Sequence, residues 1–154
     1  MPKTDIIESK SALLEVLKWL TDRERNMVEQ VRELVVRESP THDKSACDAL
    51  CNYLAQQFEA VGGRVKINRQ PKAGNHLQVE FAGPRGRKAL LLLGHYDTVY
   101  DLGTLAIMPW REYKGRLLGP GVFDMKSGIA QIMFALQALK QIKGDLAQIG
   151  RAHV

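Results

Sequence analysis

A histidine and an aspartate follow the most apolar stretch of the chain. In "ALLLLGHYDTVY", residues 89–100, His95 and Asp97 stand two residues apart after four consecutive leucines. Side chains two apart in an extended chain leave on the same face, so Tyr96 points away from both. The Asp97 carboxylate can accept the free N–H of His95 and leave the other ring nitrogen for a metal. A surface pair or a hydrogen-bonded core histidine is the alternative interpretation.

A second segment, "GPGVFDMKSG" at 119–128, places Asp124 among three glycines just before an expected helix. The glycines indicate a backbone that turns tightly and approaches another group closely. Two roles are open for Asp124: a functional carboxylate near the free N–H groups of the helix start, or a cap for the helix that begins near Lys126. Lys126 is expected to be a solvated lysine, with a role in positioning this loop as the alternative.

Helices are expected before and after these two segments. Apolar residues recur at helical spacing, and Thr21-Asp22 can cap the second helix while Gly62-Gly63 ends the third. The pattern predicts helices at 9–20, about 23–36, about 44–61 and 127–142.

Strands are expected between the third and fourth helices, where the apolar pattern becomes alternating or continuous. The pattern predicts strands at 64–68, 77–81 and 88–93, and a short hairpin that turns at Lys114-Gly115. The four leucines of the last strand favour burial on both faces, in the middle of a sheet covered by helices. The expected fold class is therefore α/β, with helices first and then a mixed sheet.

Composition favours an ordinary globular protein of the cytoplasm. The 154 residues are 45% hydrophobic and 25% charged, and the chain has neither an apolar run of about 20 residues nor a secretory signal at its start. The net charge of +5 is spread among acidic residues, which favours a solvated surface over a nucleic-acid face. Cys47 and Cys51, four apart in a helix, are expected to be reduced.

Together the two chemical segments resemble a known signature. Residues 94–128, "GHYDTVYDLGTLAIMPWREYKGRLLGPGVFDMKSG", closely resemble that of the dinuclear zinc exopeptidase family, which contains glutamate carboxypeptidase, acetylornithine deacetylase, succinyl-diaminopimelate desuccinylase and aminoacylase. A looser resemblance covers 23–142 and includes "ESPT" at 38–41. "GHYDTVY", "GTLAIMPW" and "GPGVFDMKSG" look most like the glutamate carboxypeptidase branch.

The resemblance implies a role for each of the three candidate residues. His95 is implied as a ligand of one zinc, Asp124 as the carboxylate that bridges two zinc ions, and Asp97 as the catalytic-site residue that orients His95. It also implies a three-layer α/β/α catalytic domain and amide hydrolysis, with cobalt as a substitute metal. The implied substrate is a small peptide, with a C-terminal glutamate or similar residue released, or an N-acyl amino acid. The implied assembly is a homodimer formed through a domain absent from this chain, without nucleic acid or membrane.

The resemblance also implies that this chain is incomplete. The family's Glu-Glu pair, a further acidic ligand and a late histidine have no counterpart here, so we expect residues 1–147 to be the N-terminal portion of a catalytic domain, inactive and prone to aggregate. The last six residues, "IGRAHV", are what the start of a widely used sequencing adapter encodes, so residues 148–154 are expected to be a non-native tail. A non-catalytic binding module built on a remnant of this fold is the alternative function, and basic nucleic-acid binding is a third.

Overall fold

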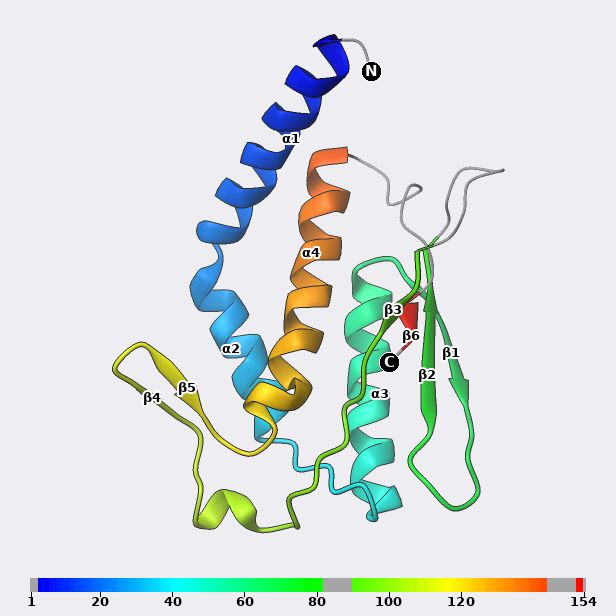
Figure 1. Ribbon diagram of the computed structural model, residues 1–154. Coiled ribbons are helices and arrows are strands. Elements are labelled where there is room, and N and C mark those ends of the chain that lie inside the picture. Colours follow the sequence, from blue (N-terminus) through cyan, green and yellow to red (C-terminus); the bar gives the residue numbers. More distant parts are fainter. Residues whose placement is uncertain (1–2, 82–89, 144–151, 154) are drawn as a thin grey trace.

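Figure 1 shows the computed structural model of the chain, in which four helices gather on one side of a small sheet. The structure describes residues 3–81, 90–143 and 152–153. The helices are α1 (Lys3–Thr21), α2 (Glu24–Val35), α3 (Lys44–Ala60) and α4 (Ser127–Lys143). The strands are β1 (Arg64–Asn68), β2 (His76–Glu80), β3 (Leu92–Leu93), β4 (Arg111–Tyr113), β5 (Arg116–Leu118) and β6 (Ala152–His153).

The predicted helices are present, and one predicted cap is wrong. Asp43 caps α3, because its carboxylate accepts the N–H of Ala46 at 2.9 Å. At the start of α2 the capping position is Arg23, which makes no side-chain capping bond. Thr21 still belongs to the last turn of α1, and its hydroxyl donates to the Leu17 carbonyl at 2.9 Å. A threonine inside a helix commonly bonds back to its own helix in this way, so it cannot serve the next one.

The main sheet is mixed, as expected, in the order β1-β2-β6-β3. β1 and β2 pair antiparallel, from Arg64 opposite Glu80 to Asn68 opposite His76. β6 lies between β2 and β3, antiparallel to the former and parallel to the latter. The predicted hairpin forms from β4 and β5, with both turn residues, Lys114 and Gly115, at positive φ. The α/β fold class is therefore confirmed.

Among the described residues, one hydrophobic core joins α2, α3, α4 and the inner face of the sheet. Its members are apolar side chains with almost no exposed surface, contributed by each of these elements. The largest of them are Leu34, Leu50, Leu54, Phe58, Leu77, Val79, Ile129, Met133 and Leu136. The two cysteines are also buried in this core and are free thiols, as expected. Within the described residues, no helix is long and apolar enough to cross a membrane.

The expectation that the strand before His95 is buried on both faces is wrong. Leu91 is 57% exposed and Leu93 73%, whereas Leu92 and Gly94, which alternate with them, are half-buried. The helices lie on one side of the sheet, so only alternate residues of this segment face them (Figure 1). The first two residues of the predicted strand, 88–89, lie outside the described residues.

Most of the expected tail, 148–154, also lies outside the described residues. Its two described residues, Ala152–His153, form β6. The division of the chain at residue 147 stays a prediction.

Candidate metal centre

The structure brings His95, Asp97 and Asp124 together. Nε2 of His95 lies 2.9 Å from Oδ1 of Asp124. Nδ1 of the same ring lies 3.1 Å from the Asp97 carbonyl oxygen and 3.3 Å from its carboxylate Oδ1. Each ring nitrogen therefore faces a different aspartate. Asp97 lies on the same face as His95, as its spacing predicts, and Asp124 belongs to a loop that is 29 residues away in sequence.

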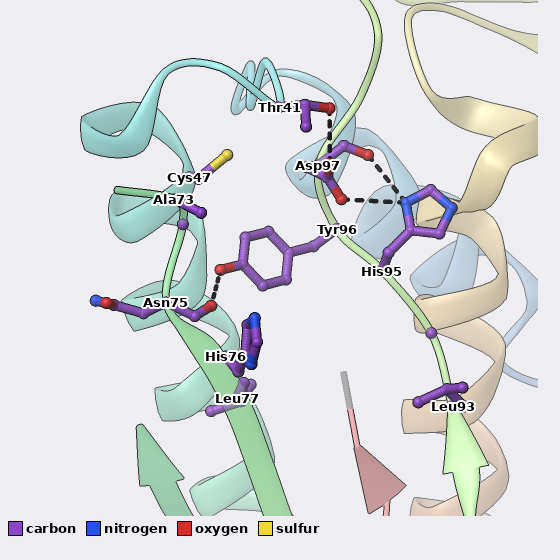
Figure 2. Close-up of a pocket in the computed structure, with 12 residues that line it drawn as sticks. Thr41, Cys47, Ala73, Asn75, His76, Leu77, Leu93, His95, Tyr96 and Asp97 are labelled. Carbon is purple, nitrogen blue, oxygen red and sulfur yellow. Dashed lines mark hydrogen bonds and ion pairs between the residues drawn. The ribbon is translucent and has the colours of Figure 1, made fainter. Parts of the chain in front are cut away.

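The alternation of the β3 segment continues into this site and separates His95 from Tyr96. His95 lies on the same exposed face as Leu93, whereas Tyr96 is buried on the opposite face. Figure 2 shows the two rings on opposite sides of the backbone, with the Tyr96 hydroxyl donating to the Asn75 carbonyl. Burial raises the pKa of Tyr96, so this hydroxyl keeps its proton. The buried tyrosine thus anchors the segment that presents His95.

The loop that carries Asp124 needs a glycine at position 121. Gly121 has a φ of 72°, and a Cβ there would lie 2.5 Å from Cγ2 of Thr98. A side chain would therefore be strained and would also push the loop away from the His95 segment. This contact bears out the expectation that the glycine-rich backbone approaches another group closely.

Asp124 does not have the capping role that its segment left open. α4 begins at Ser127, whose hydroxyl donates to the Val122 carbonyl at 2.6 Å, while the Asp124 carboxylate contacts the His95 ring. Its side chain is 78% exposed. The chain leaves helical geometry at Asp124 and Met125, which turns the carboxylate away from the helix and toward His95.

Lys126 is buried, so the expectation of a solvated lysine is wrong. It is 1% exposed, and its Nζ donates to the Arg37 carbonyl at 2.8 Å. Arg37 lies just beyond the end of α2, where helix carbonyls lack a partner of their own and favour a cation. Burial lowers the pKa of Lys126 to about 8. The structure supports the alternative role, in which Lys126 positions the loop. Its bond to Arg37 attaches the Asp124 loop to the segment that follows α2.

That segment, "ESPT", runs beside the His95 segment. The Ser39 hydroxyl donates to the Tyr96 carbonyl at 2.7 Å, and the Thr98 N–H donates to the Ser39 carbonyl at 2.8 Å. Thr41 bonds in turn to the Thr98 carbonyl through its N–H, at 2.9 Å, and its hydroxyl donates to Oδ2 of Asp97 at 2.7 Å. Sequence reasoning named "ESPT" only as part of a resemblance and assigned no role to Thr41.

The Glu38 carboxylate of the same segment holds the loop on the far side of the site. It accepts the N–H groups of Gly103 and Leu105, at 2.8 and 2.9 Å. Gly103 precedes the short 3-10 helix over Thr104–Ala106, and Leu105 is its middle residue. The "ESPT" segment therefore contacts three parts of the site: the His95 segment, Asp97 and the loop that follows them.

The charges around His95 favour a cation. Burial alone would lower the pKa of His95, but the hydrogen bonds to Asp124 and to the Asp97 carbonyl outweigh it, helped by both carboxylate charges, and the pKa is raised. Two carboxylates facing one imidazole stabilise positive charge between them, whether it is a proton or a metal ion.

The donor set fits zinc. Zinc is bound by imidazole nitrogen and carboxylate oxygen, and here Nε2 of His95 and Oδ1 of Asp124 converge while Nδ1 is held by Asp97. In the part of the chain that the structure describes, no group of three or more histidine, cysteine, aspartate or glutamate side chains could hold a metal. The described residues thus offer two candidate ligands, His95 and Asp124, and one carboxylate placed to orient His95.

The candidate centre opens into two pockets. One, of about 540 Å³, lies between the His95 segment, the Asp124 loop and the β4–β5 hairpin, and Arg111 and Phe123 line it with His95 and Asp124. The other, of about 370 Å³, lies between the ends of β2 and β3 and is shown in Figure 2. His95 and Asp97 line both pockets. A ligand of several atoms therefore has room beside the candidate metal-binding atoms.

Comparison with known proteins finds similarity to a peptidase family. Residues 91–150 match the family described as Peptidase family M20/M25/M40, and this stretch contains His95, Asp97 and Asp124. The chain is also 34% identical over 124 residues to carboxypeptidase G2 of Pseudomonas sp. (strain RS-16). The chain is a relative of the M20 peptidases. That alignment covers 79% of this chain but only 29% of carboxypeptidase G2.

Solved structures show the same fold. Human carnosine dipeptidase 1 matches with a TM-score of 0.75 and 18% identity, covering 92% of this chain and 33% of the dipeptidase. The M20 family metallo-carboxypeptidase Sso-CP2 from Sulfolobus solfataricus matches with a TM-score of 0.67 and 18% identity, covering 82% of this chain and 29% of the carboxypeptidase. The chain therefore spans about a third of the length of the proteins that it matches.

Proposed function

We propose that the protein to which this chain belongs is a metal-dependent M20 hydrolase that cleaves an amide bond. The observation that carries the proposal is the convergence of Nε2 of His95 and Oδ1 of Asp124, with Asp97 against the other ring nitrogen, within the segment that matches the family. Metal-binding histidines commonly donate their second N–H to a carboxylate or a carbonyl, and Asp97 offers both.

In this proposal His95 and Asp124 would hold zinc, and the two oxygens of the Asp124 carboxylate would allow it to serve a second ion. Bound zinc polarises an amide carbonyl and makes a nearby water more acidic. The chain's own residues orient these ligands: Asp97 fixes the His95 ring, and Gly121 lets the Asp124 loop approach it closely. The general base and the remaining ligands have no counterpart in this chain, so we propose that the chain by itself is inactive.

The names of two relatives support a carboxypeptidase reaction. Carboxypeptidase G2 and the Sulfolobus metallo-carboxypeptidase are both named for removal of a C-terminal residue. We propose the same reaction here, with a C-terminal glutamate as the favoured residue and deacylation of an N-acyl amino acid as the second possibility. We further propose that the protein acts in the cytoplasm. It would do so as a homodimer, formed through a part of the protein outside this chain.

Zinc binding by the chain tests the metal centre directly. Calorimetry should show zinc binding that weakens about 10-fold or more in His95→Ala and in Asp124→Ala, because each removes one donor. His42→Ala is the matched control, since His42 is exposed and pairs only loosely with Asp101, at 3.5 Å. Equal zinc binding by all four proteins would contradict the proposed centre.

Catalysis is tested on the protein from the complete gene. Its cleavage of N-acyl-glutamate should be lost on chelation and restored by zinc or cobalt, whereas the 154-residue chain should show no turnover with either metal. Activity that is indifferent to chelators would refute the mechanism. Zinc binding without any amide hydrolysis by the complete protein would favour the binding-module alternative.

A further inference from the structure

The Asp97 carboxylate lies between two groups that come from different parts of the chain. Its Oδ2 accepts the Thr41 hydroxyl at 2.7 Å, and its Oδ1 lies 3.3 Å from Nδ1 of His95. Figure 2 shows Thr41 and the His95 ring on either side of Asp97. Thr41 is 56 residues away in sequence, so folding alone brings this hydroxyl to the site.

The Thr41 hydroxyl restricts the rotation of the Asp97 side chain. The terminal torsion of an aspartate has a broad energy minimum, so one weak contact leaves the direction of its oxygens loosely defined. A hydroxyl has a single proton to donate, and the Thr98 carbonyl at 3.1 Å competes for it with the carboxylate. The bond to Asp97 is shorter and has a charged acceptor, which makes it the stronger of the two. With Oδ2 held, Oδ1 is directed toward His95.

The backbone around Thr41 is itself fixed, so its hydroxyl has a defined position. The Thr41 N–H bonds to the Thr98 carbonyl, and the Thr98 N–H bonds to the Ser39 carbonyl, which pairs the two segments like parallel strands. Ser39 is fully buried, and its hydroxyl bonds to the Tyr96 carbonyl. The distance between Thr41 and Asp97 is therefore set by backbone pairing and does not depend on the exposed hydroxyl bond alone.

We propose that Thr41 is a positioning residue of the metal centre. It holds the Asp97 carboxylate beside Nδ1 of His95, where it adds to the contact with the Asp97 carbonyl and keeps Nε2 directed toward the metal. The inference rests on the proposed function, because it assumes that His95 and Asp124 bind a metal. Loss of a group that hydrogen-bonds to a metal ligand typically lowers metal affinity by about 10- to 100-fold. Thr41 acts on His95 through the Asp97 carboxylate, so we expect an effect at the lower end of this range.

The test measures the zinc affinity of the chain by competition with a chromophoric chelator. Thr41→Val removes the hydroxyl, nearly keeps the side-chain shape and should weaken zinc binding about 10-fold. Thr41→Ser retains the hydroxyl and should bind zinc like the unchanged chain. Thr104→Val is the matched control, because the Thr104 hydroxyl donates to a backbone carbonyl, that of Asp101, and makes no contact with Asp97.

A double-mutant cycle separates positioning from a general structural effect. If Thr41 acts through Asp97, then Thr41→Val should cause little further loss in an Asp97→Ala background, whereas an unrelated structural defect would add to the loss. If Thr41→Val does not fold, as judged by circular dichroism, the same cycle is run with Thr41→Ala, and Thr41→Ser again serves as the rescue.

The outcomes distinguish this inference from the proposed function. Zinc binding that depends on His95 but is unchanged by both Thr41→Val and Thr41→Ala overturns the role of Thr41 and leaves the metal centre intact. Additive losses in the cycle also overturn it. Absence of zinc binding by the unchanged chain overturns the metal centre, and the role of Thr41 falls with it.

Discussion

The Cys47 thiol lies behind the candidate metal centre and is held in its neutral form. Its Sγ donates to the Pro40 carbonyl at 3.1 Å, in the "ESPT" segment. Burial raises the pKa of Cys47 to about 11, and the Asp97 charge adds to the shift. A thiolate here would be desolvated and would face the carboxylate that orients His95. The residue is therefore a neutral hydrogen-bond donor that supports the site.

The raised pKa of Cys47 predicts a pH-dependent stability. The unfolded thiol ionises near its ordinary value of 9.0, but the folded thiol keeps its proton until about pH 11. Its contribution is thus fully present below pH 9 and is lost as the pH rises to 11, because the unfolded state releases its proton first. Urea unfolding should show the wild-type chain losing stability relative to Cys47→Ala across this window. A constant difference between the two proteins would contradict the shift.

Only some of the side-chain contacts in the site could be predicted from the sequence. The shared face of His95 and Asp97 follows from the local geometry of an extended chain, so their spacing was sufficient. The burial of Lys126 depends on a carbonyl 89 residues away, and the bond from Thr41 to Asp97 spans 56 residues. Nothing in the local pattern encodes contacts over such distances. Only the resemblance of "ESPT" pointed toward that segment, and it assigned no role to Thr41.

Helix α3 begins three residues after the end of the "ESPT" segment, and its cap fixes the backbone between them. The Asp43 carboxylate accepts the Ala46 N–H, and the Asp43 N–H bonds to the Pro40 carbonyl. Helices α2, α3 and α4 were predictable because each has a periodic apolar face, and α3 also has a local stop signal in Gly62-Gly63. The exposure of the leucines near β3 was not predictable, because burial of a strand face depends on which elements cover it.

Removal of the α3 cap should destabilise the chain without changing the metal ligands. Asp43→Ala leaves the Ala46 N–H without its partner and is expected to lower the free energy of unfolding by about 1 kcal/mol. Asp43→Asn keeps an acceptor oxygen and should retain most of the stability. Chemical denaturation of the three proteins measures the difference, and equal midpoints for Asp43→Ala and the wild type would show that the cap contributes nothing.

Large apolar side chains are exposed on several parts of the molecule, including α1 and the β3 segment. On α1 they are Leu13, Leu14 and Leu17, and around β3 they are Leu90, Leu91 and Leu93. Leu93 and His95, two residues apart, are both on the exposed face of the β3 segment. Exposed leucines next to strand backbone are a recognised route to association between chains, and a net charge of +5 opposes it only weakly in salt.

Association between copies of this chain should therefore depend on the exposed face of the β3 segment. Leu93→Lys places a charge on that face, and it should reduce concentration-dependent association measured by sedimentation velocity. Gln131→Lys is the matched control, because it adds the same charge at an exposed position on α4, far along the chain from β3. A reduction by both variants would assign the effect to net charge alone. A wild-type chain that stays monomeric at all concentrations and melts cooperatively would show that these leucines do not drive association.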